Sequence, residues 1–210
     1  MRKLMRMRLM PGRTVALAVA VMLACLVARG AAAEGGPSEV VRHFYDVLLS
    51  TMRDAEKLGF KGRYQALAPV VLATFDVPFM TRLSVGPPWA KLSPDEKRRA
   101  GQAFARYITT NYASEFDGYS GERFEIIGEQ RIPHATVVRT QIVKPDGDRV
   151  TINYALHDND TAWQVRDVYL AGTISELATR RSDFTSTLRS GGIEALIARL
   201  NQKADELYGK

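Results

Sequence analysis

The chain has 210 residues, with 29 basic and 23 acidic side chains, a formal net charge of +6 and one cysteine, Cys25. Six of the basic residues and none of the acidic ones fall in the first 33 positions, which leaves 23 of each sign in the rest of the chain. Equal numbers of basic and acidic residues after position 33 argue against a protein that binds nucleic acid through a net positive charge.

Residues 1–33 have the pattern of a secretory signal peptide. A basic segment is followed by an apolar run from Val15 to Val27 and by the small residues Ala31-Ala32-Ala33. The run is too short to be a convincing membrane span. We predict cleavage after Ala33 and export to the periplasm; the alternatives are an uncleaved N-terminal anchor and a lipid-modified Cys25. A single domain of about 177 residues, 34–210, would remain, without a disulfide.

The first half of this domain has helical periodicity. Ser38 is a candidate cap for a first helix, which Gly59 and Gly62 should break. A second helical stretch runs from Tyr64 to Phe75 and is interrupted by Pro69, which predicts a kink or a restart. A short helix should start at Asp76 and carry Phe79, Met80 and Leu83, and the Gly86-Pro87-Pro88 segment should end it.

Ser93 marks the clearest helix start in the chain. It can serve as N-cap, with Pro94 at the first helical position and Glu96 completing a capping box. The long helix that follows should end near Gly118.

From Phe124 onward the period changes to two, which predicts a four-stranded antiparallel meander. The strands are expected near Phe124, over 135–143, over 149–156 and over 163–170, and two amphipathic helices should close the chain. Helices, then strands, then helices indicate an α+β fold, with helices packed on a curled sheet that could enclose an apolar cavity.

No catalytic or metal-binding motif stands out. The histidines His43, His134 and His157 have no metal-ligand spacing, and acidic residues in the hairpin turns are explained by turn chemistry. We expect neither a metal nor another cofactor.

Asp167 is unusual, because it lies in a predicted strand whose alternation places Trp163, Val165, Asp167 and Tyr169 on one face. In a structural role it would accept hydrogen bonds from a helix N-terminus or pair with an arginine such as Arg181. In a chemical role it would be the general base of a cone-shaped isomerase or hydratase, with Tyr154 as hydrogen-bond donor. We favour the structural role.

The chain resembles the MlaC-like, toluene-tolerance family of periplasmic lipid carriers. The matching residues occur in family order: Phe75-Asp76 and Met80, Gly86 to Trp89, Leu92-Ser93 with Phe104 and Tyr112, Tyr119 and Gly121, Tyr154, the segment 163–168, and then Gly172, Ser175, Arg181, Phe184, Gly192 and Leu196-Ile197. The segments 167–170 and 172–177 are most similar to the branch associated with hopanoid biosynthesis, HpnM. Two departures are Ser84 to Pro88, where the family usually has Leu-Gly, and Arg180, where a tyrosine usually stands.

The resemblance implies a carrier that shuttles phospholipid or hopanoid across the periplasm between inner- and outer-membrane complexes, without bond chemistry. Leaving an acyl chain in water costs about 0.8 kcal/mol per methylene, so a carrier must cover most of it. An exported scaffold or assembly protein with a filled core is the remaining alternative. Our candidate lipid-binding residues are Phe79, Leu83, Phe104, Tyr107, Val138, Ile142, Ile152, Tyr154, Trp163 and Val165.

Overall fold

Two paired helices open the computed structural model, which describes residues 35–208; the predicted signal peptide lies outside these residues. Helix α2 spans Pro37–Arg53 and helix α3 spans Ala55–Thr74. The predicted cap at Ser38 is wrong, because Pro37 already occupies the first helical position and Gly36 is the N-cap. The Ser38 backbone N–H instead donates a hydrogen bond to Glu129 at 3.0 Å.

Helix α3 bends at one of the two glycines that were expected to break the first helix. Gly59 has non-helical backbone angles, whereas Gly62 lies inside the helix. Pro69 also lies inside α3, so the predicted restart there does not occur. The neighbouring Leu67, Val70 and Val71 are buried, and their packing keeps the helix intact although Pro69 has no N–H to donate.

The next helices confirm the local start and stop signals. Asp76 is the N-cap of α4 (Val77–Val85), where its carboxylate accepts a hydrogen bond from the Phe79 N–H at 3.1 Å. The 3₁₀ helix η2 (Pro87–Lys91) follows. Helix α5 (Pro94–Glu115) begins with the predicted capping box between Ser93 and Glu96 and ends three residues before Gly118. Local hydrogen bonding alone accounts for these boundaries.

Five antiparallel strands form one sheet in the order β1-β2-β3-β4-β5. Their bounds are β1 Arg123–Ile132, β2 Ala135–Val143, β3 Arg149–Asp158, β4 Trp163–Leu170 and β5 Ile174–Ser175. The meander was predicted, and β2 and β4 have the predicted bounds. Strand β5 was not predicted, because a two-residue strand is too short to show a period. Strand β3 extends two residues beyond its predicted end at Leu156.

A β-bulge at Arg166 changes which side chains of β4 share a face. Val165 pairs with Leu156 and Val168 pairs with Tyr154, so both valines face the core, while Asp167 pairs with Ala155 on the other face. The prediction that Val165 and Asp167 share a face is therefore wrong. Strict alternation fails here because a bulge inserts one unpaired residue into the strand.

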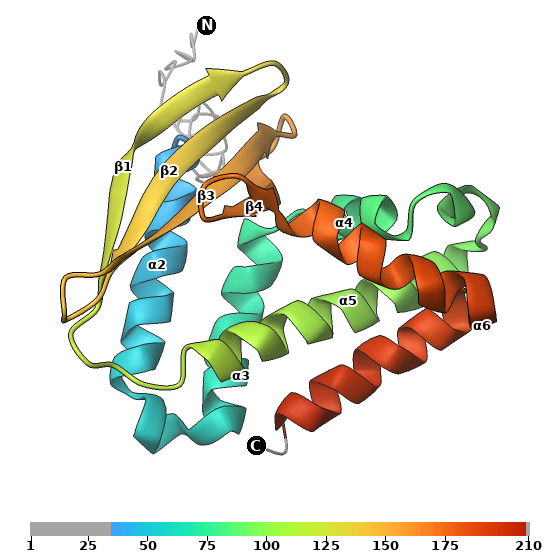
Figure 1. Cartoon of the computed structure of the whole chain (residues 1–210), viewed down its shortest axis with the longest axis horizontal. Helices are drawn as coiled ribbons and strands as arrows, with labels where there is room; N and C mark the ends of the chain where they lie inside the picture. The colour runs from blue at the N-terminus through green and yellow to red at the C-terminus, as the bar shows by residue number, and fades with distance from the viewer. Residues whose placement is uncertain (1–34, 209–210) are drawn as a thin grey trace, which may run out of the picture. The chain divides into compact units, whose positions relative to one another are not determined.

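The two predicted closing helices are the two arms of α6 (Glu176–Tyr208), which is interrupted at Gly192. Gly192 has a positive φ of 66°, which favours glycine and lets the chain turn back on itself between the two arms. Figure 1 shows the two arms diverging from this turn, with α5 beside them. Ile174, which was assigned to the first of these helices, lies in β5 and is 56% exposed.

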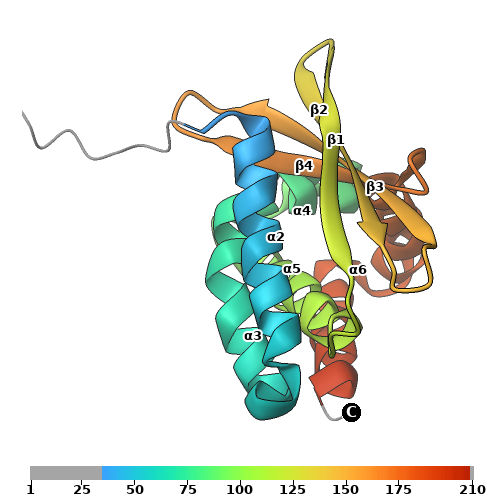
Figure 2. The ribbon, with the colours of Figure 1, turned by 90° about the vertical axis from the view of Figure 1, so that its left-hand side faces the viewer.

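The main core lies where the helices cover one face of the sheet. Figure 2 shows α2 and α3 side by side beneath the strands. Phe44 of α2 is fully buried against Phe75, Tyr112 and Tyr154, with ring centroids 5.2–6.4 Å apart. The second arm of α6 packs Leu196 and Leu200 into the same apolar cluster, which also contains Phe104 of α5.

None of the helices in residues 35–208 is long and apolar enough to cross a membrane. The described residues also contain no group of three or more His, Cys, Asp or Glu side chains placed to hold a metal ion.

Candidate functional site

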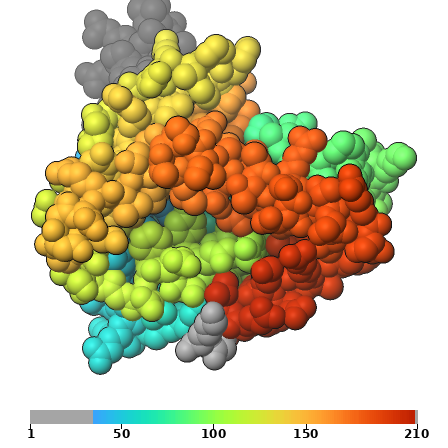
Figure 3. All heavy atoms as spheres, viewed as in Figure 1, coloured from blue at the N-terminus to red at the C-terminus, as the bar shows by residue number. Residues whose placement is uncertain are grey.

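An open cleft of about 470 Å³ lies between the sheet, α5 and the first arm of α6. Its size is within the range of ligand-binding pockets. In Figure 3 the surface is hollowed between the strands and α5. The cleft is lined by Phe75, Met80, Tyr107, Ile108, Asn111, Tyr112, Glu115, Phe116, Ile152, Tyr154, Val168, Leu170, Glu176, Thr179, Arg180 and Asp183.

The sheet supplies an apolar wall to this cleft. Ile152 and Tyr154 point the same way because they are two residues apart on β3. On the neighbouring strand β4, Val168 pairs with Tyr154 and Leu170 pairs with Ile152. The bulge at Arg166 brings the side chains of Val168 and Leu170 to the same face as these two partners. Leu170 is 37% exposed, so the apolar wall continues to the surface.

Three of the ten predicted lipid-binding residues line the cleft: Tyr107, Ile152 and Tyr154. Three others, Phe104, Val138 and Val165, are fully buried in the core and do not reach the cleft. Leu83, Ile142 and Trp163 are partly buried and also lie outside the cleft lining. The same apolar residue types make both the core and the cleft, and only the tertiary structure separates them.

Phe79, the tenth candidate, belongs to a different cluster at the α4–β4 contact. The Arg166 guanidinium lies 4.3 Å from the centre of the Phe79 ring, and the Arg82 guanidinium lies 5.2 Å from it. Arg166 is held in place by Asp76, to which its Nε donates at 2.8 Å. Phe79 therefore packs against cations rather than against the cleft.

Two buried tyrosines, Tyr112 and Tyr154, line the cleft, and a third, Tyr45, packs against Tyr154 from the core. Tyr45 of α2 shares a hydrogen bond of 2.6 Å with Thr140 of β2, and its ring meets Tyr154 at 5.8 Å in an edge-on geometry. Burial raises the pKa of Tyr45 to about 12. Burial likewise raises the pKa of Tyr112 and that of Tyr154, so all three phenols are neutral near pH 7.

The first arm of α6 supplies a polar wall. Arg180 donates a hydrogen bond to Glu176 at 3.0 Å, and both side chains are mostly buried. The Arg180 guanidinium lies over the Tyr107 ring at 5.2 Å and near the Phe104 ring at 5.9 Å. In the sequence Arg180 stands out only as a departure from the family pattern.

The helical spacing of the polar residues in the first arm of α6 is a sequence signal for this polar wall. The cleft-lining residues Glu176, Thr179, Arg180 and Asp183 recur at helical spacing, whereas the buried Leu177 and Phe184 each follow one of them by a single residue. Such a pattern places the polar side chains on one face of the helix. It does not show that this face borders a cleft.

Asp167 lies at the corner between β4 and α6. One carboxylate oxygen accepts a hydrogen bond from the Leu177 N–H at 3.1 Å, and the other accepts from the Ser175 hydroxyl at 2.6 Å. Ser175 in turn accepts from the Ala178 N–H at 3.0 Å. Asp167 is absent from the cleft lining, and its oxygens are engaged at the start of the helix.

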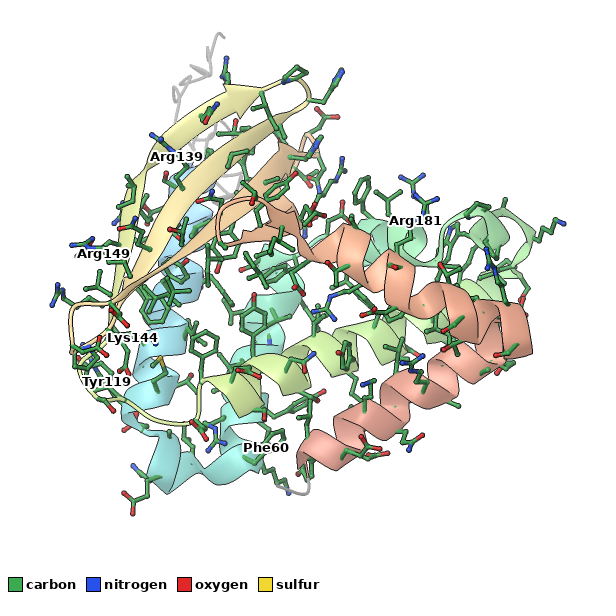
Figure 4. All side chains as sticks on the ribbon, in the orientation of Figure 1. Phe60, Tyr119, Arg139, Lys144, Arg149 and Arg181 are labelled. Atoms are coloured by element: carbon green, nitrogen blue, oxygen red, sulfur yellow. The ribbon has the colours of Figure 1, made fainter. Side chains whose placement is uncertain are left out.

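Arg181 does not form the suggested ion pair with Asp167 within residues 35–208. Its guanidinium approaches Gly86 at the end of α4, where a side-chain Cβ would lie 3.3 Å from the arginine Nε. Gly86 also has a positive φ of 72°, so both conformation and space favour glycine there. Figure 4 shows Arg181 beside α4.

Comparison with known proteins identifies the family. The model of the MlaC protein family matches residues 42–202. The chain belongs to the MlaC family. The match extends from α2 into the second arm of α6 and includes every strand of the sheet.

A solved structure has the same fold as this MlaC-family chain. It is a phospholipid-binding protein from Ralstonia solanacearum, in complex with a phospholipid. The two structures align with a TM-score of 0.72 at 17% sequence identity, over 82% of this chain and 99% of the other. At this identity the comparison shows a shared α+β fold.

Proposed function

We propose that this protein is a periplasmic lipid carrier that holds a phospholipid or a hopanoid in the cleft between the sheet, α5 and α6. The observation that carries the proposal is the cleft itself, which has a continuous apolar wall on one side and hydrogen-bonding groups on the other. An amphipathic ligand needs both surfaces. MlaC family membership and the phospholipid bound to the Ralstonia protein support the same assignment.

The carrier needs no bond chemistry. It would take a lipid from one membrane complex and release it to another, and release requires a partner that favours an opened or emptied form. Leu170 provides an apolar exit, because it lines the cleft and is also exposed. The predicted signal peptide, 1–33, and the periplasmic location of MlaC proteins support export of a single domain, 34–210. The hopanoid branch is favoured by the segments 167–170 and 172–177 alone.

The isomerase alternative is disfavoured by the position of Asp167. A general base must reach the proton that it removes, but Asp167 lies outside the cleft lining and accepts hydrogen bonds from Ser175 and Leu177. The scaffold alternative requires a filled core and does not explain a cleft of about 470 Å³.

Lipid content of the purified protein tests the proposal. We expect a stoichiometric phospholipid or hopanoid in the mass spectrum of the native protein, and a marked loss of it in Ile152→Glu, which places a charge on the apolar wall. Ile127→Glu is the matched control, because Ile127 is 50% exposed on β1 and does not line the cleft. A folded Ile152→Glu variant with unchanged lipid content would contradict the location, and wild-type protein without lipid would contradict the function.

A further inference from the structure

The cleft runs from an exposed opening to a buried end. Leu170 lies at the opening and is 37% exposed. At the other end the lining side chains are only 2–7% exposed, and they belong to Phe75, Met80, Ile108, Tyr154 and Val168. Tyr154 is the exception among these residues, because it carries a hydroxyl. The buried end of the cleft is therefore apolar except for a phenol group.

A chain of hydrogen bonds behind this end uses the proton of Tyr45. The Thr140 hydroxyl donates to the backbone carbonyl of Ile152 on the neighbouring strand. A hydroxyl has one proton to donate, so Thr140 can only accept in its 2.6 Å contact with Tyr45. Tyr45 must therefore donate to Thr140. The Tyr45 oxygen can accept a further hydrogen bond, but it has no second proton to offer to another group.

The hydroxyls of Tyr112 and Tyr154 are open to the cleft. Both residues line it, and within residues 35–208 neither hydroxyl has a protein partner at the distance and angle of a hydrogen bond. Ser84 Oγ is the only fully enclosed side-chain oxygen or nitrogen in this range that lacks a partner. The two phenol hydroxyls are therefore reached from the cleft, although Tyr154 is only 2% exposed.

Contacts among the phenols cannot satisfy all of these groups. Burial, and then the neighbouring phenols of Tyr45 and Tyr112, raise the pKa of Tyr154, which indicates that the three hydroxyls lie close together. If they move into hydrogen-bonding range, Tyr154 can donate to Tyr45 and Tyr112 can donate to Tyr154. The Tyr112 oxygen then remains an acceptor without a donor, because the proton of Tyr45 is held by Thr140. A ligand with an O–H group completes this chain.

The buried end suits an uncharged hydroxyl better than other polar groups. Both phenols are neutral near pH 7, and Arg180, a cation that lines the cleft, is already paired with Glu176 at 3.0 Å. An anionic group would lose its hydration there without a compensating charge. A ligand hydroxyl can accept the Tyr154 proton and donate to the Tyr112 oxygen, whereas an ether or carbonyl only accepts and a methylene does neither.

We infer that the buried end of the cleft binds a hydroxyl group carried on the hydrocarbon part of the lipid, with Tyr112 and Tyr154 as its hydrogen-bonding partners. The cargo is then a hydroxylated hydrocarbon, and a lipid whose buried part is a plain acyl chain binds less well. The rest of the hydrocarbon lies on the apolar wall of Ile152 and Leu170. This inference rests on the proposed lipid-carrier function and narrows the class of its cargo.

Competitive loading with two isomers tests this site. Hexadecanol and methyl pentadecyl ether contain the same atoms, but only the alcohol has an O–H group. Delipidated protein is incubated with phosphatidylcholine vesicles that contain equal amounts of both, and the bound probes are quantified by gas chromatography. We expect the ratio of bound alcohol to bound ether to be about fivefold higher in wild-type protein than in Tyr112→Phe/Tyr154→Phe, as for the loss of one neutral hydrogen bond.

A matched variant controls for the loss of two hydroxyls. Tyr64→Phe/Tyr119→Phe makes the same chemical change at residues that do not line the cleft, so it should keep the wild-type ratio. The single variants Tyr112→Phe and Tyr154→Phe measure each hydroxyl separately, and each should lower the ratio in part. They also supply the comparison with wild-type protein in the case that the double variant does not fold.

Phosphatidylcholine bound in the same assay, measured by mass spectrometry, reports on the carrier function separately. Wild-type protein that binds phosphatidylcholine but gives the same alcohol-to-ether ratio as the folded Tyr112→Phe and Tyr154→Phe variants would overturn the hydroxyl site and leave the carrier proposal intact. Binding of phosphatidylcholine with neither probe would have the same consequence. Wild-type protein that binds no lipid of any kind would overturn both.

Discussion

Two successive turns of α5 use similar residues for different purposes. In the first turn Phe104 is fully buried and meets Phe184 edge to face at 6.3 Å. One turn further along, Tyr107 lines the open cleft and supports Arg180. A cleft therefore arises here where the helices and the sheet separate, without a change in the kind of side chain that they present.

The largest effects are expected from truncating Phe104 and Tyr107 of α5. We expect Phe104→Ala to lower the free energy of unfolding by about 3–5 kcal/mol, because it leaves a cavity in the core. Tyr107→Ala should cost clearly less, because its side chain borders solvent, but it should reduce bound lipid. Denaturant unfolding and lipid mass spectrometry measure the two effects. Equal destabilisation by both variants would contradict the separation into core and cleft.

The dependence of unfolding free energy on pH above pH 10 should report the burial of the Tyr45 hydroxyl. The pKa of Tyr45 is raised to about 12 in the folded state from 10.0, so its stabilisation is fully present below pH 10 and is lost as pH rises through the folded value. Between these values the loss is about 1.4 kcal/mol per pH unit.

The variant Tyr45→Phe should therefore reduce the slope of unfolding free energy against pH by about 1.4 kcal/mol per unit above pH 10. Tyr119→Phe is the control, because Tyr119 is 40% exposed and should leave the slope unchanged. Chemical denaturation across this pH range supplies the measurement. An identical slope in Tyr45→Phe and wild-type protein would show that the Tyr45 hydroxyl is not protected from solvent in the folded state.

The smallest expected effect concerns the corner that joins the sheet to α6. Asp167→Ala removes the acceptor for the Leu177 N–H and the Ser175 hydroxyl, so we expect a loss of about 1–2 kcal/mol in unfolding free energy. Asp167→Asn keeps one oxygen and should lose less. If thermal and denaturant unfolding showed no loss in either variant, Asp167 would not stabilise this corner.

Local signals in the sequence predicted much of the fold. The capping box at Ser93, the cap at Asp76 and the alternation in β2 each involve neighbouring residues, so the elements appear where expected. The break at Gly59 was expected, but the continuous helix at Gly62 and at Pro69 was not. Whether such residues interrupt a helix depends on packing from other parts of the chain.

The candidate site was predicted less well than the fold. Tyr107, Ile152 and Tyr154 line the cleft, but Val138 and Val165 have the same apolar character and lie in the core. Arg180 and Glu176 were missed as cleft residues, because a polar helix face most often meets solvent.

The helix starts at Asp76 and Ser93, the antiparallel meander and the resemblance to the MlaC family could be read from the sequence, because they follow from local hydrogen bonding, periodicity and residue order. The face that Asp167 occupies depends on the folded sheet, since the bulge at Arg166 shifts the pairing of β4 by one residue. The tertiary structure also decided which aromatic side chains border open space. That distinction depends on the distance between elements remote in sequence, which no local pattern of residues encodes.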